Sequence, residues 1–463
     1  MRKQYKNNFN NLFNKISKFK GNYKIDSRNI NAGDIFIALK GSKEHGENYI
    51  EHAINNKAKY VISEKIIPRF KNKTIHVNNC FSALKFISDY KRSNYNGRIV
   101  GITGSVGKTS VKEQLSYFLN FIYKTYSSIK SYNNNLGVNL SLANLDPDSP
   151  ISILEIGTNK FGEIANLTKL IKPHIAIITN IGPTHLKSFK NIKNIAKEKS
   201  NIFNKKINSK IETIIVPFNN DDKNYIYNNA IKNKNCKIFT FGKSSKADAF
   251  IKKITRLKNE KFLVEAKVLK NNLKYELSVN GEHQVLNSLI SLLVFYIFGI
   301  KFDKFKKNAP SLPKLSGRGK LYFLLLNKKK VTLIDESYNA SPLSMKETIG
   351  YYNKYSINKG RKKYLILGDM LELGKKENHF HSQLRKYLDH NSFYKIITCG
   401  KLIKSLHKSY RGNNMFHFNN RIELRKYLLS DIHNGDFILA KCSNNTIVNK
   451  FVKQIKKMRI NKL

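Results

Sequence analysis

Cysteine and proline are scarce in this sequence, and tryptophan is missing altogether. The 463 residues include four Cys and nine Pro. The cysteines (Cys80, Cys236, Cys399 and Cys442) are scattered, with no C-x-x-C spacing and no histidine cluster beside them. This pattern argues against a zinc site and against a disulfide scaffold, and it is typical of a reducing compartment. We therefore expect a cytoplasmic protein.

Long apolar runs are also missing. The longest, at 289–300, has 12 residues, whereas a helix needs about 20 to cross a bilayer. We interpret it as a buried helix. The N-terminal segment MRKQYKNNFNNLFNKISKFK is positively charged but lacks the continuous apolar core of a signal peptide. The sequence thus predicts no membrane insertion.

Acidic residues are few: 32 Asp and Glu stand against 84 Lys and Arg, a net charge of +52. Such an excess alone would suggest a nucleic-acid partner. It is spread along the whole chain, however, together with abundant Asn and Ile, so we interpret it as a residue bias and expect no nucleic-acid partner. The alternative, a basic nucleic-acid-binding ATPase, would predict ATP hydrolysis stimulated by DNA or RNA and steeply salt-dependent binding.

The chain is too long for one core, and its patterns divide it into blocks at 1–97, 98–312 and 313–463. Strands and helices alternate in each block, so we predict an α/β protein of three domains. The central block should hold a mostly parallel sheet covered on both faces, and the third a doubly wound, Rossmann-like sheet. Alternation of apolar and polar residues at 249–279 predicts antiparallel strands.

The strands expected in the first block lie at 35–39, 60–62 and 74–77, and its helices at 49–56 and 82–90. In the second block we expect strands at 99–102, 151–156, 174–180 and 213–216. In the third block we expect strands at 331–334, 364–367, 395–398 and 436–440. Pro310 and Pro313 mark the linker before the third block.

A glycine-rich loop, Gly-Ile-Thr-Gly-Ser-Val-Gly-Lys-Thr at 101–109, lies between the strand at 99–102 and a helix. Gly104 and Gly107 allow backbone N–H groups to turn toward an anion. Lys108 supplies a charge for terminal phosphates, and the Thr109 hydroxyl can bind Mg²⁺. Ile102 stands where a strict phosphate loop has glycine, so the loop is a variant, and we expect a central phosphate-loop ATPase domain.

At this loop the sequence resembles the Mur ligases, and the resemblance spans nearly the whole chain. The segments that carry it, in chain order, are DSR at 26–28, GDIFIALKG at 33–41, TGSVGKTSVKE at 103–113, SYNNNLGV at 131–138, EIGTN at 155–159, GEI at 162–164, AKEKSNIF at 196–203, GEHQVLN at 281–287, GR at 317–318, DESYNASP at 335–342 and GDMLELG at 368–374. The SYNA and GDMLELG segments resemble the branch that adds a dipeptide.

The resemblance implies an ATP-dependent, amide-bond-forming ligase of peptidoglycan precursor synthesis. In the branch indicated, the substrates are UDP-N-acetylmuramoyl-tripeptide and D-alanyl-D-alanine, and an acyl phosphate is the intermediate. The cofactors implied are ATP and Mg²⁺, with two ions, and a monomer is expected. Another amide ligase of the superfamily, adding a different amino acid or acting on a folate, is the alternative. The SYNA segment and the missing folate-type motifs weigh against it.

The resemblance also implies roles for single residues. The ATP phosphates would lie against Gly104, Ser105, Val106, Gly107, Lys108, Thr109 and Ser110. One Mg²⁺ would bind Thr109 and Glu155, and a second would bind His185 and Lys199. Lys199, 14 residues after His185, would carry a CO₂-derived carbamate, whose oxygens suit a hard cation. Lys108, His185 and Lys199 are thus the expected catalytic residues.

Further residues are expected around the nucleoside and the muramoyl substrate. Asn287, Arg318, Glu336 and Asn339 would contact ATP, and Ser27, Arg28, Asn133 and Asn134 would bind the UDP-sugar. Some positions depart from the family pattern: Gln284 and Asn139 replace Asn and Pro, Asn135 replaces an acid, and Glu47 replaces His. In addition, KCSNN at 441–445 replaces KGSR, which bears on the D-alanyl-D-alanine contacts.

Overall fold

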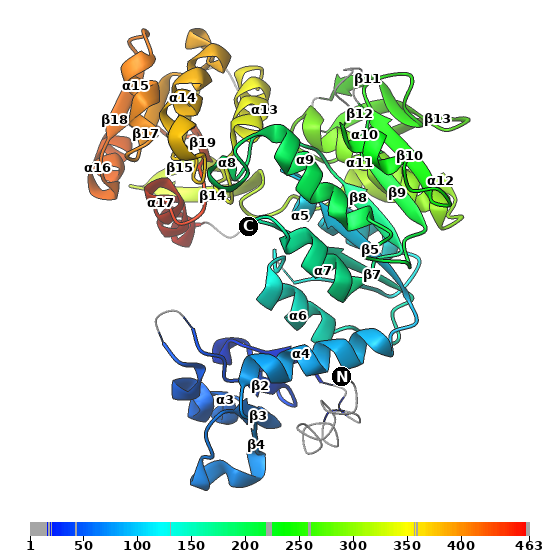
Figure 1. The fold of residues 1–463 in the computed structure, drawn as a ribbon. Coiled ribbons are helices and arrows are strands. Elements are labelled where there is room, and N and C mark those ends of the chain that lie inside the picture. Colours follow the sequence, from blue (N-terminus) through cyan, green and yellow to red (C-terminus); the bar gives the residue numbers. More distant parts are fainter. Residues whose placement is uncertain are drawn as a thin grey trace.

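The computed structural model describes residues 16, 19, 21–41, 44–129, 131–218, 225–257, 261–355, 357 and 360–459. Within these ranges the strands form three sheets, one in each predicted block. Figure 1 shows the N-terminal sheet in blue at one end, the central sheet in cyan and green, and the C-terminal sheet in yellow to red. The α/β, three-domain prediction is confirmed.

The N-terminal domain is a small parallel sheet in the order β1-β2-β3-β4. Its elements are β1 (Tyr23–Lys24), β2 (Ile35–Ile37), α3 (Ile50–Asn55), β3 (Tyr60–Ser63), β4 (Thr74–His76) and α4 (Cys80–Ser93). Helix α4 begins where the Asn79 side chain accepts a hydrogen bond from the Ser82 amide, which satisfies one of the free N–H groups of the first turn. In Figure 1 this helix lies between the sheet and the central domain.

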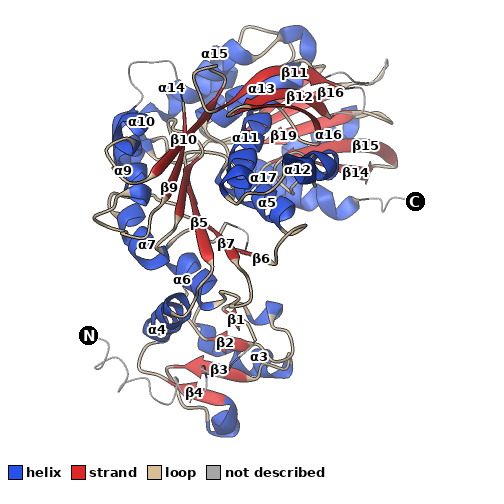
Figure 2. Ribbon diagram, turned by 90° about the vertical axis from the view of Figure 1, so that its right-hand side faces the viewer, coloured by secondary structure: helices blue, strands red, loops and turns tan. Residues whose placement is uncertain are grey.

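The central sheet has the order β13-β12-β11-β10-β9-β8-β5-β7-β6. Its strands are β5 (Arg98–Thr103), β6 (Thr125–Ser127), β7 (Ile151–Glu155), β8 (Ile175–Ile178), β9 (Thr213–Pro217), β10 (Lys237–Gly242), β11 (Ala249–Arg256), β12 (Phe262–Val268) and β13 (Asn271–Leu277). Pairing is parallel from β6 to β11 and antiparallel from β11 to β13, as predicted. Figure 2 shows these strands as one twisted layer.

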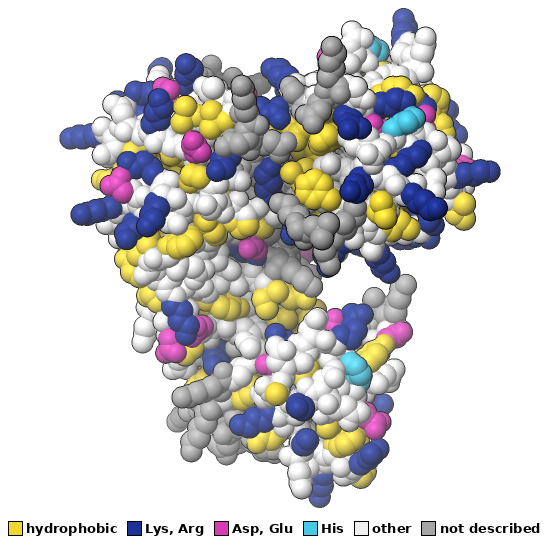
Figure 3. Space-filling model, turned by 180° about the vertical axis from the view of Figure 1, so that it is seen from behind, with side chains coloured by type: hydrophobic (Ala, Val, Ile, Leu, Met, Phe, Trp, Pro, Cys, Tyr) yellow, Lys and Arg dark blue, Asp and Glu magenta, His cyan; other side chains and the backbone are white. Residues whose placement is uncertain are grey.

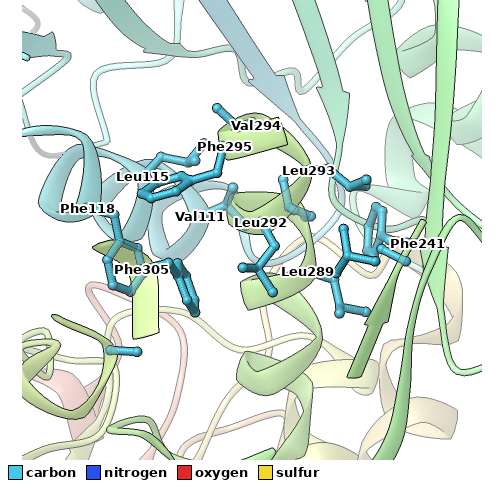
Figure 4. Packing of buried hydrophobic residues seen from close by; sticks show 14 of the residues in the cluster. Val111, Leu115, Phe118, Phe241, Leu289, Leu292, Leu293, Val294, Phe295 and Phe305 are labelled. Carbon is cyan, nitrogen blue, oxygen red and sulfur yellow. The ribbon is translucent and has the colours of Figure 1, made fainter. Parts of the chain in front are cut away.

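Helices cover both faces of the central sheet. They are α5 (Lys108–Leu119), α6 (Asn135–Ala143), α7 (Glu163–Ile171), α8 (Leu186–Phe189), α9 (Ile192–Ser200), α10 (Tyr225–Ala230), α11 (Glu282–Ile297) and α12 (Phe302–Asn308). Figure 4 shows Val111, Leu115 and Phe118 of α5 packed against α11, including Leu292 and Phe295. The apolar run at 289–300 therefore lies in the core, and removing these side chains from water fixes α5 behind the glycine loop.

The C-terminal sheet has the order β14-β15-β19-β16-β17-β18, parallel except for the edge strand β14. Its strands are β14 (Lys320–Leu326), β15 (Lys329–Glu336), β16 (Lys363–Gly368), β17 (Lys395–Cys399), β18 (Met415–Phe418) and β19 (Phe437–Lys441). Its helices are α13 (Pro342–Asn353), α14 (Glu377–Ser382), α15 (Lys404–Ser409), α16 (Arg421–Asp431) and α17 (Ile447–Ile455). Separate apolar clusters cover its two faces, as in a doubly wound fold.

Three further observations concern the basic side chains, the cysteines and the helices. In Figure 3, Lys and Arg side chains are dispersed over the visible face and do not gather in one patch. The four cysteines are free thiols, and three of them are buried. Among the described residues, no helix is both long and apolar enough to cross a membrane.

Candidate active site

The glycine-rich loop joins β5 to α5, and hydrogen bonds to the segment just after β8 hold its backbone. The Val106 N–H donates to Oδ1 of Asn180 at 2.9 Å, and the Ser105 N–H donates to the Asn180 carbonyl at 3.0 Å. Gly104 has φ +152°, and a Cβ there would collide with the Thr179 hydroxyl. Glycine is required at this position because of both the conformation and the contact.

Four side chains with polar oxygens or amides converge beside the loop. The Thr109 hydroxyl donates to Oε2 of Glu155 at 2.7 Å and lies 3.0 Å from Oγ of Ser131. Nδ2 of Asn133 donates to the other carboxylate oxygen of Glu155 at 2.7 Å. Glu155 ends β7 and is 1% exposed. Such a cluster of hydroxyl and carboxylate oxygens is the donor set that Mg²⁺ prefers.

Two lysines lie near this carboxylate, Lys108 half-buried and Lys199 buried. Nζ of Lys108 donates to the Gly104 carbonyl at 2.8 Å, and burial lowers the pKa of Lys108 despite the nearby Glu155 carboxylate. Lys199, on α9, is 2% exposed, and burial together with the charge of Lys108 holds its pKa well below the usual range. The charge of Lys108 thus disfavours a second ammonium at Lys199. Of the two side chains, Lys199 is the stronger candidate for a neutral amine.

Acidic side chains order the segments that surround Lys199. Glu198 is buried and accepts hydrogen bonds from the Gly162 and Ile164 amides at 3.0 and 2.9 Å, which caps the start of α7. Glu163 accepts from the Asn159 and Lys160 amides. The GEI and AKEKS segments therefore fix the backbone around Lys199. A carboxylate at a helix N-terminus, such as that of Glu198, is also stabilised by the helix dipole.

A cavity of ≈ 810 Å³ opens in front of the loop and is lined by both the central and the C-terminal domain. The central domain contributes Ser105, Val106, Gly107, Lys108, Thr109, Ser110, Asn133, Glu155 and Asn287, and the C-terminal side contributes Arg318, Glu336, Asn339 and Lys441. A second cavity of ≈ 370 Å³ shares Ser110, Gln284, Asn287 and Arg318 with the first. Nucleotide-sized space thus extends from the loop toward the linker.

Charged groups from the third domain line the far wall. Glu336 ends β15, and burial raises its pKa although Nζ of Lys441 lies 3.5 Å from its carboxylate. Arg318 lies with its guanidinium carbon 4.5 Å from the centre of the Tyr338 ring, a cation–π contact that fixes its direction. His283, on α11 of the central domain, is half-buried; burial and the charge of Lys441 lower its pKa to about 4, so this ring is neutral.

His185 lies apart from these groups. Its backbone has φ +51° just before α8, and Nδ1 lies 2.5 Å from Oε2 of Glu372 in the C-terminal domain. The contact with His185 lowers the pKa of Glu372. Partial burial of the carboxyl acts in the opposite direction but has the smaller effect. Among the described residues, no hydrogen bond or ion pair joins His185 to Lys199 or Glu155. The structure therefore brings together Lys108, Thr109, Glu155 and Lys199, but not His185.

Comparison with known proteins places the chain in a family. Models of the Mur ligase catalytic domain, the Mur ligase middle domain and the Mur ligase glutamate ligase domain match residues 22–87, 102–295 and 323–444. A UDP-N-acetylmuramoyl-tripeptide--D-alanyl-D-alanine ligase of Rickettsia prowazekii is 33% identical, covering 92% of this chain and 93% of its own. The chain belongs to the Mur ligase family. Members of this family are ATP-dependent amide ligases.

Two further similarities support the assignment of this chain to the Mur ligase family. A ligase of the same name from Buchnera aphidicola subsp. Baizongia pistaciae is 32% identical, covering 93% of this chain and 91% of its own. The crystal structure of MurF from Acinetobacter baumannii matches with a TM-score of 0.77 and 25% identity, covering 94% of this chain and 93% of that one. The predicted resemblance is confirmed along the chain.

The residues expected at the UDP-sugar site of this Mur ligase lie in different places. Ser27 is buried and Arg28 is exposed beside Asp26 in the N-terminal domain, and neither lines the two cavities described. Asn133 lines the larger cavity, whereas Oδ1 of Asn134 accepts from the Gly137 amide as the N-cap of α6. Substrate binding by these four residues stays a prediction.

The residues at the cavity that were not singled out from the sequence include Ser131, His283 and Lys441. Each of these lies inside a segment that had been recognised (SYNNNLGV, GEHQVLN and KCSNN), so the signal was present, but a single hydroxyl, histidine or lysine is usually structural.

One departure from the family pattern is also explained. Asn139 accepts from the Ser88 hydroxyl at 2.7 Å and donates to the Asn135 carbonyl at 2.8 Å, a bond that proline could not donate.

Proposed function

We propose that this enzyme joins D-alanyl-D-alanine to UDP-N-acetylmuramoyl-tripeptide, with ATP cleaved to ADP and phosphate. The observation that carries the proposal is the cluster of Lys108, Thr109 and Glu155 at the phosphate loop, facing Arg318 and Glu336 across one cavity. Relatives that bear this activity in their names align over more than nine-tenths of the chain. We further propose that it works as a monomer in the cytoplasm.

The loop would bind the ATP phosphates. The tripeptide carboxylate attacks the γ-phosphorus, the bond from that phosphorus to the bridging oxygen breaks, and ADP leaves. The dipeptide amine then attacks the acyl phosphate and releases inorganic phosphate. The first step brings two anions together and the second releases an anionic phosphate, so positive charge fixed beforehand at the phosphoryl group lowers both barriers. Lys108 supplies that charge, and its lowered pKa is restored by the phosphates, which favour the ammonium form.

Mg²⁺ fits the donor set of the site. The hydroxyl of Thr109 and the carboxylate of Glu155 would hold one ion, since both are hard oxygen donors within 2.7 Å of each other. When bound, the ion neutralises phosphate charge in the phosphoryl transfer. Asn133 orients the carboxylate of Glu155 by donating to its second oxygen, and Ser131 holds the hydroxyl of Thr109.

Lys199 would act as a carbamate. Burial and the charge of Lys108 lower the pKa of Lys199 well below its usual range, which favours the neutral amine that can react with CO₂ and then release a proton. The product is an anion with two oxygens, a hard ligand for a second Mg²⁺ that His185 would share. An ammonium at this place would repel the ion. The ring of His185 would have to lie nearer Lys199 than it does here, which requires movement at the start of α8.

The nucleoside would lie where the two cavities meet. Both cavities are lined by Ser110, Gln284, Asn287 and Arg318. These residues lie between the phosphate loop and the linker, where the α-phosphate and the ribose would lie. Asn287 can donate and accept at a base edge, and the Gln284 side chain can do the same from one turn earlier on α11. Arg318 reaches the phosphates from the linker side, and Glu336 and Asn339 would bind the ribose and base.

The muramoyl substrate would span the open space between the N-terminal and C-terminal domains. Figure 3 shows a deep notch between these two lobes, with the central domain beside it on the left. A UDP group held in the N-terminal domain by Ser27 and Arg28 would direct the peptide toward the phosphate loop. Asn133 and Asn134, at the start of α6, lie on the central side of this path.

One assay tests the proposal. The purified chain is incubated with ATP, Mg²⁺, UDP-N-acetylmuramoyl-tripeptide and D-alanyl-D-alanine, and the product is followed by mass spectrometry. We expect a UDP-muramoyl-pentapeptide, formed in equal amount to ADP and only when both peptide substrates are present. Full ATP turnover with DNA or RNA in place of the peptides would contradict the proposal, as would product from a folate and glutamate alone.

A further inference from the structure

Lys441 is a buried lysine at the wall of the large cavity, and the proposed reaction gives it no role. It ends β19, and its side chain is 4% exposed. Its Cα pairs with that of Glu336, the last residue of the neighbouring parallel strand β15. The carboxyl ends of parallel strands form the crevice in which α/β sheets bind ligands. Lys441 and Glu336 therefore lie together where the C-terminal sheet meets the cavity.

The ammonium group of Lys441 contacts both ends of one short segment, 336–339. Its Nζ lies 3.5 Å from Oε2 of Glu336 and 3.5 Å from the carbonyl oxygen of Asn339. The hydroxyl of Ser443 donates to the Ala340 carbonyl at 3.3 Å, just beyond this segment. The backbone is thus also held by an uncharged group, whereas the contact with the Glu336 carboxylate is made by the charge of Lys441.

The carboxylate of Glu336 has acceptor capacity left on the side of the cavity. Among the described residues, Lys441 is the one side chain that donates to it, whereas a carboxylate can accept about four hydrogen bonds. A Cβ at Gly319 would lie 3.0 Å from Oε1 of Glu336, so glycine leaves room beside that oxygen. Hydroxyl groups of a bound ligand can therefore donate to Glu336.

The charges around Glu336 decide whether it can act as such an acceptor. Burial raises the pKa of its carboxyl, and the charges of Lys441 and Arg318 act in the opposite direction. Asp335 also raises this pKa, but it has its own cation, with Nζ of Lys456 at 2.7 Å. Loss of Lys441 would therefore favour the protonated carboxyl, which accepts fewer hydrogen bonds and gains a donor.

We propose that Lys441 is a positioning residue that holds the carboxylate of Glu336 toward the ribose of ATP, so that the site prefers a nucleotide with both ribose hydroxyls. This rests on the proposed function, in which Glu336 binds the nucleoside. An acidic side chain near a strand end accepts hydrogen bonds from ribose in dinucleotide-binding sheets. A ligand that lacks the hydroxyl leaves the buried carboxylate without its partner and binds more weakly.

Nucleotide binding tests this pair without turnover. ADP, 2′-deoxy-ADP and 3′-deoxy-ADP are titrated into the full chain with Mg²⁺ by isothermal titration calorimetry. The wild type should bind at least one deoxy analogue about tenfold more weakly than ADP. Lys441→Met keeps the aliphatic stem without the charge, so it should bind ADP about tenfold more weakly and lose most of the preference. Lys441→Arg keeps the charge and should retain the preference.

Ser443→Ala is the matched control, because it removes a hydrogen bond to the same part of the backbone and leaves the charge beside Glu336 in place. It should keep the wild-type preference. Circular dichroism checks that each variant is folded. If Lys441→Met does not fold, Glu336→Gln should show the same loss of preference. In turnover, Lys441→Met should raise the KM for ATP about tenfold and change kcat less than about twofold.

Three results would overturn the proposal. They are equal affinity of the wild type for the three nucleotides, a wild-type preference in Lys441→Met (or, where that variant does not fold, in Glu336→Gln), and equal losses for ADP and both analogues in the variant. The last would mean that Lys441 only supports the backbone. A wild type that prefers ADP but forms no pentapeptide would refute the proposed reaction and leave the role of Lys441 intact.

Discussion

The two boundaries between domains differ in how they are built. Between the N-terminal and central domains, one apolar core runs through both: Ala83, Leu84 and Ile87 of α4 share a buried cluster with Leu140 and Ala143 of α6. Buried hydrogen bonds add to it, since Ser88 donates to Asn139 and Asn144 pairs with the backbone of Tyr23 on both sides. Such a boundary resembles the inside of one domain.

Between the central and C-terminal domains, no cluster of buried residues in the described ranges is shared; the ring of Tyr351 packs at the edge of the central core, 6.1 Å from the centre of the Phe262 ring, and the other contacts named below are polar. Arg256 donates to the Lys354 carbonyl and lies over the rings of Tyr351 and Tyr355. Asn280 donates to the Gly319 carbonyl at 2.6 Å near the linker, and the His185–Glu372 pair forms a third point. The large cavity lies between these contacts.

This difference indicates which part moves. Apolar burial holds the N-terminal and central domains as one body, whereas polar contacts around a cavity can break and re-form at small cost. The C-terminal domain contributes Arg318, Glu336 and Lys441 to the large cavity. Closure should therefore bring this domain toward the N-terminal and central domains, which form a fixed platform that carries the phosphate loop and the proposed metal sites.

The largest expected effect belongs to the platform itself. Lys108→Ala should lower kcat about a thousandfold, because it removes charge from the transferring phosphoryl group and takes no packing from a core. Steady-state kinetics and circular dichroism measure the two parts of this prediction. Lys169→Ala, at an exposed lysine on α7, is the control. An unchanged kcat with an unchanged KM for ATP would refute the loop assignment.

A second test on the platform concerns the carbamate. Lys199→Ala should lower kcat about a hundredfold, and acetate or formate should restore part of it by entering the vacated space. Lys199→Arg keeps a positive charge but cannot form this carbamate, so it should be as inactive as the alanine variant. Lys197→Ala, at an exposed position of the same helix, controls for effects on α9. Near-normal activity of the arginine variant would show that Lys199 is an ordinary cation.

The comparison of the two boundaries is tested by distances in solution. Spin labels at Glu51 and Lys169 report on the first boundary, and labels at Lys169 and Ile422 report on the second. Addition of an ATP analogue and the muramoyl substrate should change only the second distance. Arg256→Ala removes a cation–π contact across the second boundary. It should broaden the distribution of the second distance and raise the KM for ATP about two- to fivefold. Equal changes at both boundaries would contradict the division into platform and moving domain.

The smallest effect is expected at the first boundary. Asn139→Ala should cost about 1–2 kcal/mol of unfolding free energy, since it breaks buried hydrogen bonds to Ser88 and Asn135. It should leave kcat unchanged, because the boundary stays closed by apolar packing. Urea denaturation and steady-state kinetics measure both, with Asn166→Ala at an exposed position of α7 as the control. A large loss of kcat at unchanged stability would mean that this boundary also moves during turnover.

Much of the fold follows from local pattern, and the exceptions have physical reasons. The strand at 99–102, the buried run at 289–300 and the antiparallel segment at 249–279 all match the structure, because burial on one or two faces leaves a periodic trace. Strand β14 was not predicted. Its sequence KLYFLLL is apolar after Lys320, although Phe323 and Leu325 are exposed at the sheet edge. No alternation therefore marks it as a strand.

The site was predictable where it is local and unpredictable where it depends on folding. Lys108, Thr109 and Glu155 follow strands whose carboxyl ends meet at one edge, so their proximity could be expected. The pairing of His185 with Glu372 joins positions 187 residues apart (372 minus 185) in different domains. No spacing in the sequence encodes it. Likewise, the neutral state of His283 arises from burial beside Lys441, which only the folded chain shows.

The central claim, ligation through an acyl phosphate, is tested most directly by following oxygen. The tripeptide substrate is labelled with ¹⁸O in the carboxylate that reacts, and the inorganic phosphate released is analysed by mass spectrometry. If the carboxylate attacks the γ-phosphorus and the dipeptide amine then displaces phosphate, one labelled oxygen must pass into each phosphate released. We predict this transfer, dependent on D-alanyl-D-alanine and lost in Lys108→Ala. Pentapeptide formation with unlabelled phosphate would contradict the account.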